Sequence, residues 1–262
     1  MAPDEAGPVT DPVPPAPAAP LRAVLKWMLL ASLVGALTGL VDAGFIALVH
    51  LAVAASNHYE RIFYLLPATF FVTALLGRFV FKNDAGTDKI IDAIDHHEGR
   101  VAGGFVPTKV VNVFLILATG GSAGKESPCA QIGAGLAGLC ANVLNAPGAD
   151  RRKMVICGVS AGFACVFGAP VSGALFGIEL LAAGMLQYDV LLPAFVASIT
   201  AFHLSSALGI TFFNYPLPVI PAFRESFFFI LFAGGIFFGL CANGYVRVMR
   251  AAKAFTARLP LW

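Results

Sequence analysis

Charged residues are scarce in this sequence: Asp, Glu, Lys and Arg make up only 12% of the 262 residues, whereas 58% are apolar. A soluble domain carries about 25% charged residues. The 17 basic and 15 acidic residues are spread thinly, without the dense basic face that binding to nucleic-acid phosphates requires. The composition therefore predicts an integral membrane protein that contacts lipid and has no nucleic-acid partner.

Patterns typical of disulfides or metal sites are also missing. All five cysteines lie in apolar segments, outside any CxxC pair: Cys129, Cys140, Cys157, Cys165 and Cys241. The pair His96-His97 lies in a charged stretch, and adjacent side chains on a helix diverge instead of converging on one ion. We expect small buried cysteines, a solvated turn at the histidines, and no metal or cofactor.

The chain divides by composition into a proline-rich start and a series of apolar stretches. Residues 1–21 contain seven prolines and predict a disordered tail. The apolar stretch Trp27–Val49 is long enough to span a bilayer core of roughly 30 Å. Arg22 and Lys26 precede it, which indicates a cytoplasmic N-terminus in the plasma (inner) membrane. Further apolar stretches follow at about 62–81, 106–119, 127–149, 154–182, 189–213 and 226–246.

Glycine and proline interrupt several of these stretches. Small residues at such density let membrane helices approach closely. The sequence Gly168-Ala169-Pro170 predicts a break between two shorter helices, because proline disfavours helix just before itself. Broken helices inside a membrane are typical of transporters, which use them to bind ions.

The strongest functional signal is the run GGSAGKESP over residues 120–128, which opens a long uncharged segment. Glycines followed by Pro128 in a first helical turn predict a helix N-terminus with exposed N–H groups, which suits an anion. A carboxylate at membrane depth costs about 2.5–3.5 kcal/mol, and a helix terminus returns typically about 0.3–1 kcal/mol. Helix polarity alone does not offset burial of Glu126, so we expect a mobile or protonatable side chain that can trade places with a dissolved anion.

Two enzyme motifs are approximated nearby. A Walker A loop would need glycine at Thr119 and Ser or Thr at Glu126, so nucleotide binding is excluded. Gly158-Val159-Ser160-Ala161-Gly162 does match G-x-S-x-G, and with His203 it leaves an intramembrane serine protease as an alternative function. A small-residue helix interface explains the same pattern equally well. We therefore expect a protein that is not an enzyme.

The run GKESP over residues 124–128, together with the later run FGAPVSGALFGIE over 167–179, resembles the glycine-rich motifs of the CLC family of chloride channels and chloride/proton exchangers. The resemblance implies an all-α membrane fold: a CLC-like bundle of tilted and broken helices built as inverted repeats. It also implies transport of chloride or a similar small anion. Family members are homodimers, some of them voltage-gated channels and others antiporters, and segments 170–182 and 189–208 would face the partner.

The resemblance also assigns roles to individual residues. Glu126 matches the gating glutamate, and the segment that would line the anion pathway comprises Gly124, Lys125, Ser127 and Pro128. Thr87 resembles the serine whose hydroxyl helps to hold the central anion, although a capped start of a cytoplasmic helix is the alternative. Glu179 resembles the first acidic residue at the end of the family's F-x-x-E segment and is the candidate for proton transfer, although a helix-end carboxylate facing water is the alternative. Exchangers commonly carry a second glutamate beside it, where this chain has Leu180, so we expect weak proton coupling.

The chain matches only the first repeat of such a protein. We expect the first repeat over residues 22–222 and the first helix of a second repeat over 223–262, with the remainder of that repeat not present. A non-transporting half that needs a second polypeptide is therefore another alternative function. Asp42, His50 and His203 are the other ionisable groups in apolar segments; for Asp42 a functional role and a structural role are left open.

Overall fold

The computed structural model describes residues 19–59, 61–80, 86–101, 103–179, 188–212 and 225–256, and these ranges contain helices and loops but no strand. The chain separates into two compact units, residues 1–213 and 214–262. The predicted tail, residues 1–21, falls mostly outside the described ranges. The first helix begins at Ala19, inside that segment.

Helix α1 (Ala19–His58) has 40 residues and contains the whole predicted span Trp27–Val49. A bilayer crossing needs about 20 apolar residues. Three helices in the described ranges are long and apolar enough to cross a membrane, and they cover Leu21–His58, Asp189–Ala207 and Phe227–Phe255. The membrane protein predicted from the composition, and the all-α fold that the resemblance implies, are both confirmed.

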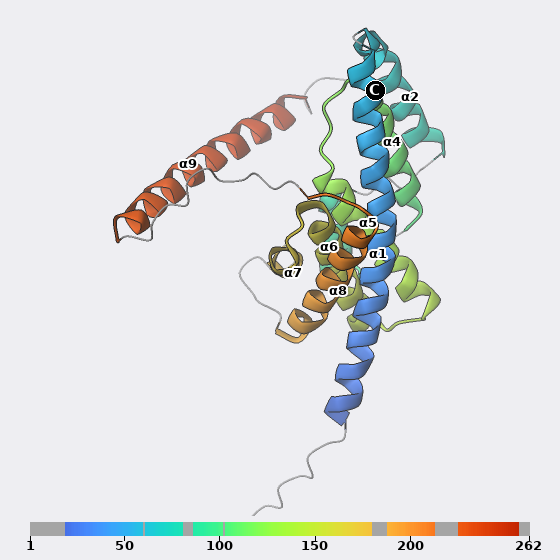
Figure 1. The fold of residues 1–262 in the computed structure, drawn as a ribbon, viewed down its shortest axis with the longest axis vertical. Helices are drawn as coiled ribbons and strands as arrows, with labels where there is room; N and C mark the ends of the chain where they lie inside the picture. Colours follow the sequence, from blue (N-terminus) through green and yellow to red (C-terminus); the bar gives the residue numbers. More distant parts are fainter. Residues whose placement is uncertain are drawn as a thin grey trace, which may run out of the picture. The chain divides into compact units, whose positions relative to one another are not determined.

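Shorter helices follow α1 and lie along one part of it (Figure 1). A 3-10 turn, Ile62–Leu65, leads into α2 (Leu66–Leu75), which continues as a π-helical turn, Leu76–Val80. After α3 (Thr87–His96), a second 3-10 turn, Gly103–Phe105, leads into α4 (Val106–Ala118). Helix α4 packs against α1, and α2 packs against α4.

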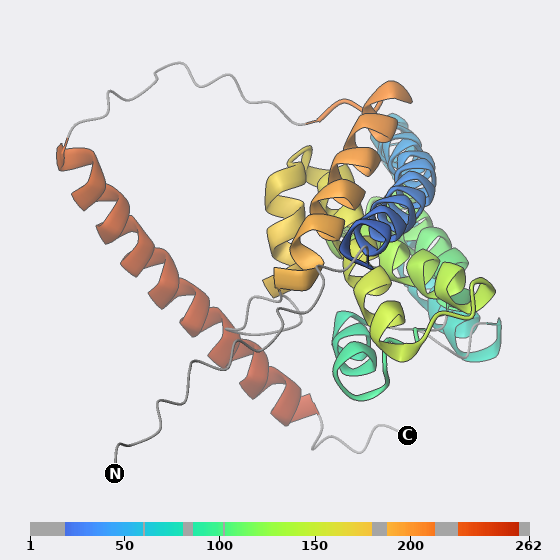
Figure 2. The same ribbon diagram turned by 90° about the horizontal axis from the view of Figure 1, so that it is seen from below.

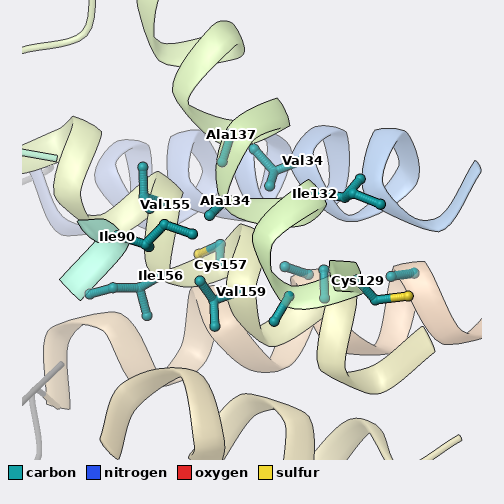
Figure 3. Close-up of a cluster of buried hydrophobic side chains, with 14 of the residues drawn as sticks. Val34, Ile90, Cys129, Ile132, Ala134, Ala137, Val155, Ile156, Cys157 and Val159 are labelled. Atoms are coloured by element: carbon teal, nitrogen blue, oxygen red, sulfur yellow. The ribbon is translucent and has the colours of Figure 1, made fainter. Parts of the chain in front are cut away.

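The centre of the first unit is the contact between α5 (Glu126–Val143) and α6 (Gly148–Phe167). The two backbones touch through glycine: a Cβ atom added to Gly158 would lie 2.2 Å from the carbonyl oxygen of Gly133. Figure 3 shows side chains of both helices filling the surrounding core together with Val34 of α1 and Ile90 of α3. The prediction that small residues bring these helices together is confirmed.

The predicted break after α6 is also confirmed. Gly168 ends that helix with a φ of 66°, a left-handed conformation that glycine adopts without strain. Helix α7 then begins at Pro170 and ends at Glu179. Helix α8 (Tyr188–Ala207) packs against α1, α6 and α7, and Figure 2 shows it beside α1 and α7.

The second unit contains α9 (Glu225–Thr256), a helix of 32 residues. Its large apolar side chains are exposed within the unit, among them Phe228, Phe229, Phe232 and Phe238. Such a surface needs lipid or protein around it.

Candidate functional site

Two helix N-termini meet at the residues for which the sequence suggested an anion site. Helix α3 begins at Thr87, and helix α5 begins at Glu126. The hydroxyl oxygens of Thr87 and Ser127, 40 residues apart in sequence, are 3.0 Å from each other. Both hydroxyls therefore lie in the first turn of a helix, where the backbone dipoles favour negative charge.

Gln131 joins the two hydroxyls. Its amide nitrogen Nε2 donates to the Thr87 hydroxyl at 3.0 Å and to the Ser127 hydroxyl at 2.8 Å, and the residue is buried. One hydroxyl hydrogen is shared between Thr87 and Ser127, so the other remains available to donate. We refer to Thr87, Ser127 and Gln131 as the hydroxyl cluster. Sequence reasoning missed the role of Gln131, although its spacing of four residues from Ser127 puts both on one helix face.

Backbone donors surround the start of α5. The N–H groups of residues 124–127 make no backbone hydrogen bond within the described residues, and no side chain caps the helix at Lys125. Pro128 has no N–H and is buried, as a proline in a first turn can be without leaving an unpaired donor. Within the predicted anion-binding segment, residues 124–127 thus present consecutive amides that are free within the described residues.

Glu126 lies directly at this group of amides. The side chain is exposed, and its carboxylate folds over the preceding glycine: a Cβ atom added to Gly124 would lie 2.7 Å from the Oε2 atom of Glu126. The carboxylate therefore occupies space at the helix N-terminus that only the missing side chain of Gly124 leaves open. Negative charge is favoured in this region by the dipoles at the helix N-terminus.

Glu179 is not brought into this cluster. It is the last residue of α7 and is exposed, and no hydrogen bond or ion pair joins it to the hydroxyl cluster among the described residues. Leu180, which bears on proton coupling, lies outside the described residues.

The G-x-S-x-G motif lies in the middle of α6 and has no preceding strand in the described part of the chain. Ser160 is fully buried, and a Cβ atom added to Gly177 of α7 would lie 2.0 Å from its Oγ atom. A hydroxyl enclosed in this way has no route to a substrate. His203, on α8, is exposed and makes an edge contact with the ring of Phe202.

The histidine pair singled out in the sequence lies on the exposed end of α3. His96 and His97 both contact Asp92, at 3.1 and 3.5 Å. No group of three or more metal-binding side chains occurs among the residues that the structure covers.

Asp42, the ionisable group whose role the sequence left open, lies in the core of the first unit. It is fully buried beside Cys129, and its oxygens accept no hydrogen bond from nitrogen or oxygen in the described ranges.

Residues 68–262 match the family model described as voltage gated chloride channel. The chain is 34% identical over 238 residues to a chloride/fluoride channel protein of Pseudomonas syringae pv. tomato, which covers 90% of this chain and 52% of that protein. It is 30% identical over 170 residues to the H(+)/Cl(-) exchange transporter ClcA of Salmonella arizonae, over 59% of this chain and 36% of the relative.

A solved structure has the same fold. The crystal structure of a CLC-type fluoride/proton antiporter superposes with a TM-score of 0.84 at 25% sequence identity, over 94% of this chain and 62% of the other. The chain therefore spans about half the length of the relative from Pseudomonas and less than two thirds of the antiporter.

Proposed function

The chain belongs to the voltage gated chloride channel family, and on that premise we propose that it contributes an anion site and a gate to a pathway that carries chloride or fluoride across a membrane. The observation that carries this proposal is the meeting of the N-termini of α3 and α5 at the hydroxyl cluster. The named relatives are a channel and exchangers, which supports transport rather than catalysis at a coarse level.

The anion would lose its water shell at this point and gain protein donors. The free amides of residues 124–127 supply several N–H groups, and the hydroxyl cluster supplies one further O–H. These donors are fixed by the two helices, so little reorganisation is needed when the ion arrives. Half-helix N-termini serve anions in this way in other transporters.

Glu126 would be the gate. Its carboxylate and a dissolved anion favour the same helix terminus and repel each other, so occupation by one excludes the other. Swinging the side chain away from Gly124 would open the terminus to the anion. Movement is feasible because the side chain is exposed.

A complete pathway would need more than this chain supplies. The chain covers 52% of the Pseudomonas relative, and the apolar surface of α9 calls for a partner or lipid. We propose that segments corresponding to the rest of that relative, on the same or a second polypeptide, complete the pathway, and that the assembly is a homodimer with a cytoplasmic N-terminus. With leucine at position 180, Glu179 would be the remaining candidate for proton transfer, and coupling would be weak.

Anion efflux from liposomes tests the function. The 262-residue chain alone should give no efflux above that of empty vesicles, and co-reconstitution with the remaining part of a relative should restore it. In the restored pathway, Ser127→Ala should weaken the apparent chloride affinity by about fivefold, because it removes a hydrogen bond worth about 1 kcal/mol. Thr73→Val is the matched control, since the Thr73 hydroxyl bonds only the carbonyl oxygen of Phe70 on α2. Equal affinities for both variants would reject the hydroxyl cluster as the anion site.

A further inference from the structure

Asp42 is a buried acidic residue that the proposed pathway does not use. It lies near the middle of the candidate span Leu21–His58, and its side chain is fully buried. Among the residues whose burial the structure describes, no other Asp or Glu is buried. An ionisable side chain at membrane depth is costly, and it usually serves the binding or movement of an ion.

The surroundings of Asp42 are two thiols from neighbouring helices. The thiol of Cys129 on α5 lies beside the carboxyl group, and the thiol of Cys165 on α6 is within electrostatic reach of it. The hydroxyl of Ser205 on α8 contacts the second thiol and not Asp42. Neither oxygen of Asp42 has a hydrogen-bond partner in the described ranges. Thiols are weak donors, so nothing around Asp42 replaces the water that a carboxylate loses on burial.

The charged residues of α4, α6 and α8, which also pack against α1, do not neutralise Asp42. Those of α6 are residues 150–153, at the opposite end of that helix from the thiol. On α8, residues 188–189 begin the helix and His203 is exposed. On α4 the ionisable residue is Lys109, and Asp42 accepts no hydrogen bond from it. A neutral carboxyl group is tolerated in such a place, whereas a carboxylate is not.

Asp42 also lies close to the proposed anion site. Cys129 is in the first turn of α5, three residues after Glu126, and its N–H donates to the carbonyl oxygen of Lys125 at 3.2 Å. Asp42 therefore lies against the buried face of the turn whose other face carries the free amides. From the dimensions of a helix, the carboxyl group and those amides are roughly 10 Å apart. Protein lies between them, so a negative charge on Asp42 would repel an anion at the amides.

We propose that Asp42 is a proton-binding site, and that its proton and an anion at the N-terminus of α5 favour each other's binding. With the proton bound, the buried face of α5 is neutral and the amides accept the anion. Release of the proton to water leaves a buried negative charge that lowers the anion affinity. By linkage, the anion strengthens proton binding by the same factor. The proton site stands on the surroundings of Asp42 alone, and the coupling rests on the proposed function.

Infrared spectroscopy of the 262-residue chain in lipid tests the proton site. A protonated carboxyl group has its own C=O absorption band, which carboxyl groups in water lose well below neutral pH. We expect a band that persists at neutral pH and is missing in both Asp42→Asn and Asp42→Leu. Thr38→Val is the matched control and should keep the band, since it removes another buried, unpaired oxygen from α1. Absence of the band from the wild type at neutral pH, or its survival in both Asp42 variants, would overturn the proposal.

Chloride titrations of efflux across a pH series test the coupling in the restored pathway. Above the pH at which the infrared band disappears, the wild type and Thr38→Val should lose apparent chloride affinity about tenfold. This is the effect of a unit charge roughly 10 Å away at an effective dielectric constant of about 20. Asp42→Asn cannot ionise and should keep its affinity over the same range. The same pH response in the wild type and in Asp42→Asn would reject the coupling.

The two measurements separate this proposal from the proposed function. If the restored wild type carries no chloride at any pH, the proposed function fails and the coupling fails with it, while the infrared band still decides whether Asp42 binds a proton. If chloride flows and the band titrates, but the chloride affinity does not follow the band, the coupling alone is wrong.

Discussion

Helix α5 has two regions with opposite properties. Its middle, around Gly133 and Ala137, is buried against the backbone of α6. Its first turn is open: the amides are unpaired within the described residues, Glu126 is exposed, and the Ser127 hydroxyl hydrogen-bonds to Thr87 of α3 and to Gln131 of its own helix. The comparison shows how one helix can be held rigidly at its centre while its N-terminus stays available for an ion.

The packed contact between α5 and α6 should lose stability even when a single methyl group is added. In Gly158→Ala the new Cβ atom would lie 2.2 Å from the carbonyl oxygen of Gly133, so the two backbones must separate. We expect a loss of about 3 kcal/mol in stability, at the upper end of typical overpacking. Thermal unfolding in detergent, followed by circular dichroism at helical wavelengths, measures this.

Gly44→Ala is the matched control in a neighbouring helix. A Cβ atom at Gly44 of α1 meets nothing within 4 Å. Alanine should stabilise the helix there by about 0.5–1 kcal/mol, because it restricts the unfolded chain. Two substitutions of the same kind should therefore change stability in opposite directions. Equal losses would contradict the packing that we describe.

Substitutions in the open first turn of α5 should change anion transport and not stability. In a restored pathway, Glu126→Gln removes the competing charge and keeps the shape, so anion flux should rise by about fivefold, corresponding to about 1 kcal/mol at a helix terminus. Gly124→Ala should raise flux in the same direction, because its Cβ atom displaces the carboxylate from a distance of 2.7 Å. Liposome efflux measures both variants.

The control for this pair is Gly104→Ala, where an added Cβ atom meets nothing within 4 Å. It should leave flux unchanged. If Glu126→Gln alters protein yield but not flux per molecule, the carboxylate is structural and is not the gate.

Gln131 connects the two regions, since it is buried with the packed part and bonded to the open part. We expect Gln131→Leu to lower the apparent anion affinity by about threefold while the maximal flux stays similar, because the hydroxyls remain but lose their orientation. Titration of efflux against chloride concentration separates affinity from maximal rate. A fall in maximal flux alone would assign Gln131 to folding or gating.

The sequence predicts much of this arrangement. The break at Gly168–Pro170 and the start of α5 follow from local rules for glycine and proline. The close contact of α5 with α6 follows from the density of small residues, although which glycines touch does not. That pairing depends on how the helices cross, which local sequence does not determine.

The site was predicted less completely. Thr87 and Ser127 came from resemblance, and their hydrogen bond depends on a long-range contact between α3 and α5. Gln131 was given no role, because a buried amide gains meaning only from the partners that surround it. The pairing of Lys153 with Asp189 across two helices was equally invisible in the sequence.

Replacing one threonine by valine in the packed region, and another in the open region, compares the two regions with the same chemical change. Thr38 of α1 is fully buried near Gly133, and its hydroxyl has no hydrogen-bond partner in the described ranges. Thr38→Val replaces that hydroxyl by a methyl group of the same size, so stability should rise by about 1 kcal/mol with flux unchanged. Thr87→Val should leave stability nearly unchanged and lower the anion affinity, because this hydroxyl belongs to the open region. Unfolding midpoints and chloride titrations of both variants provide the test, and the comparison fails if Thr87→Val loses stability without losing affinity.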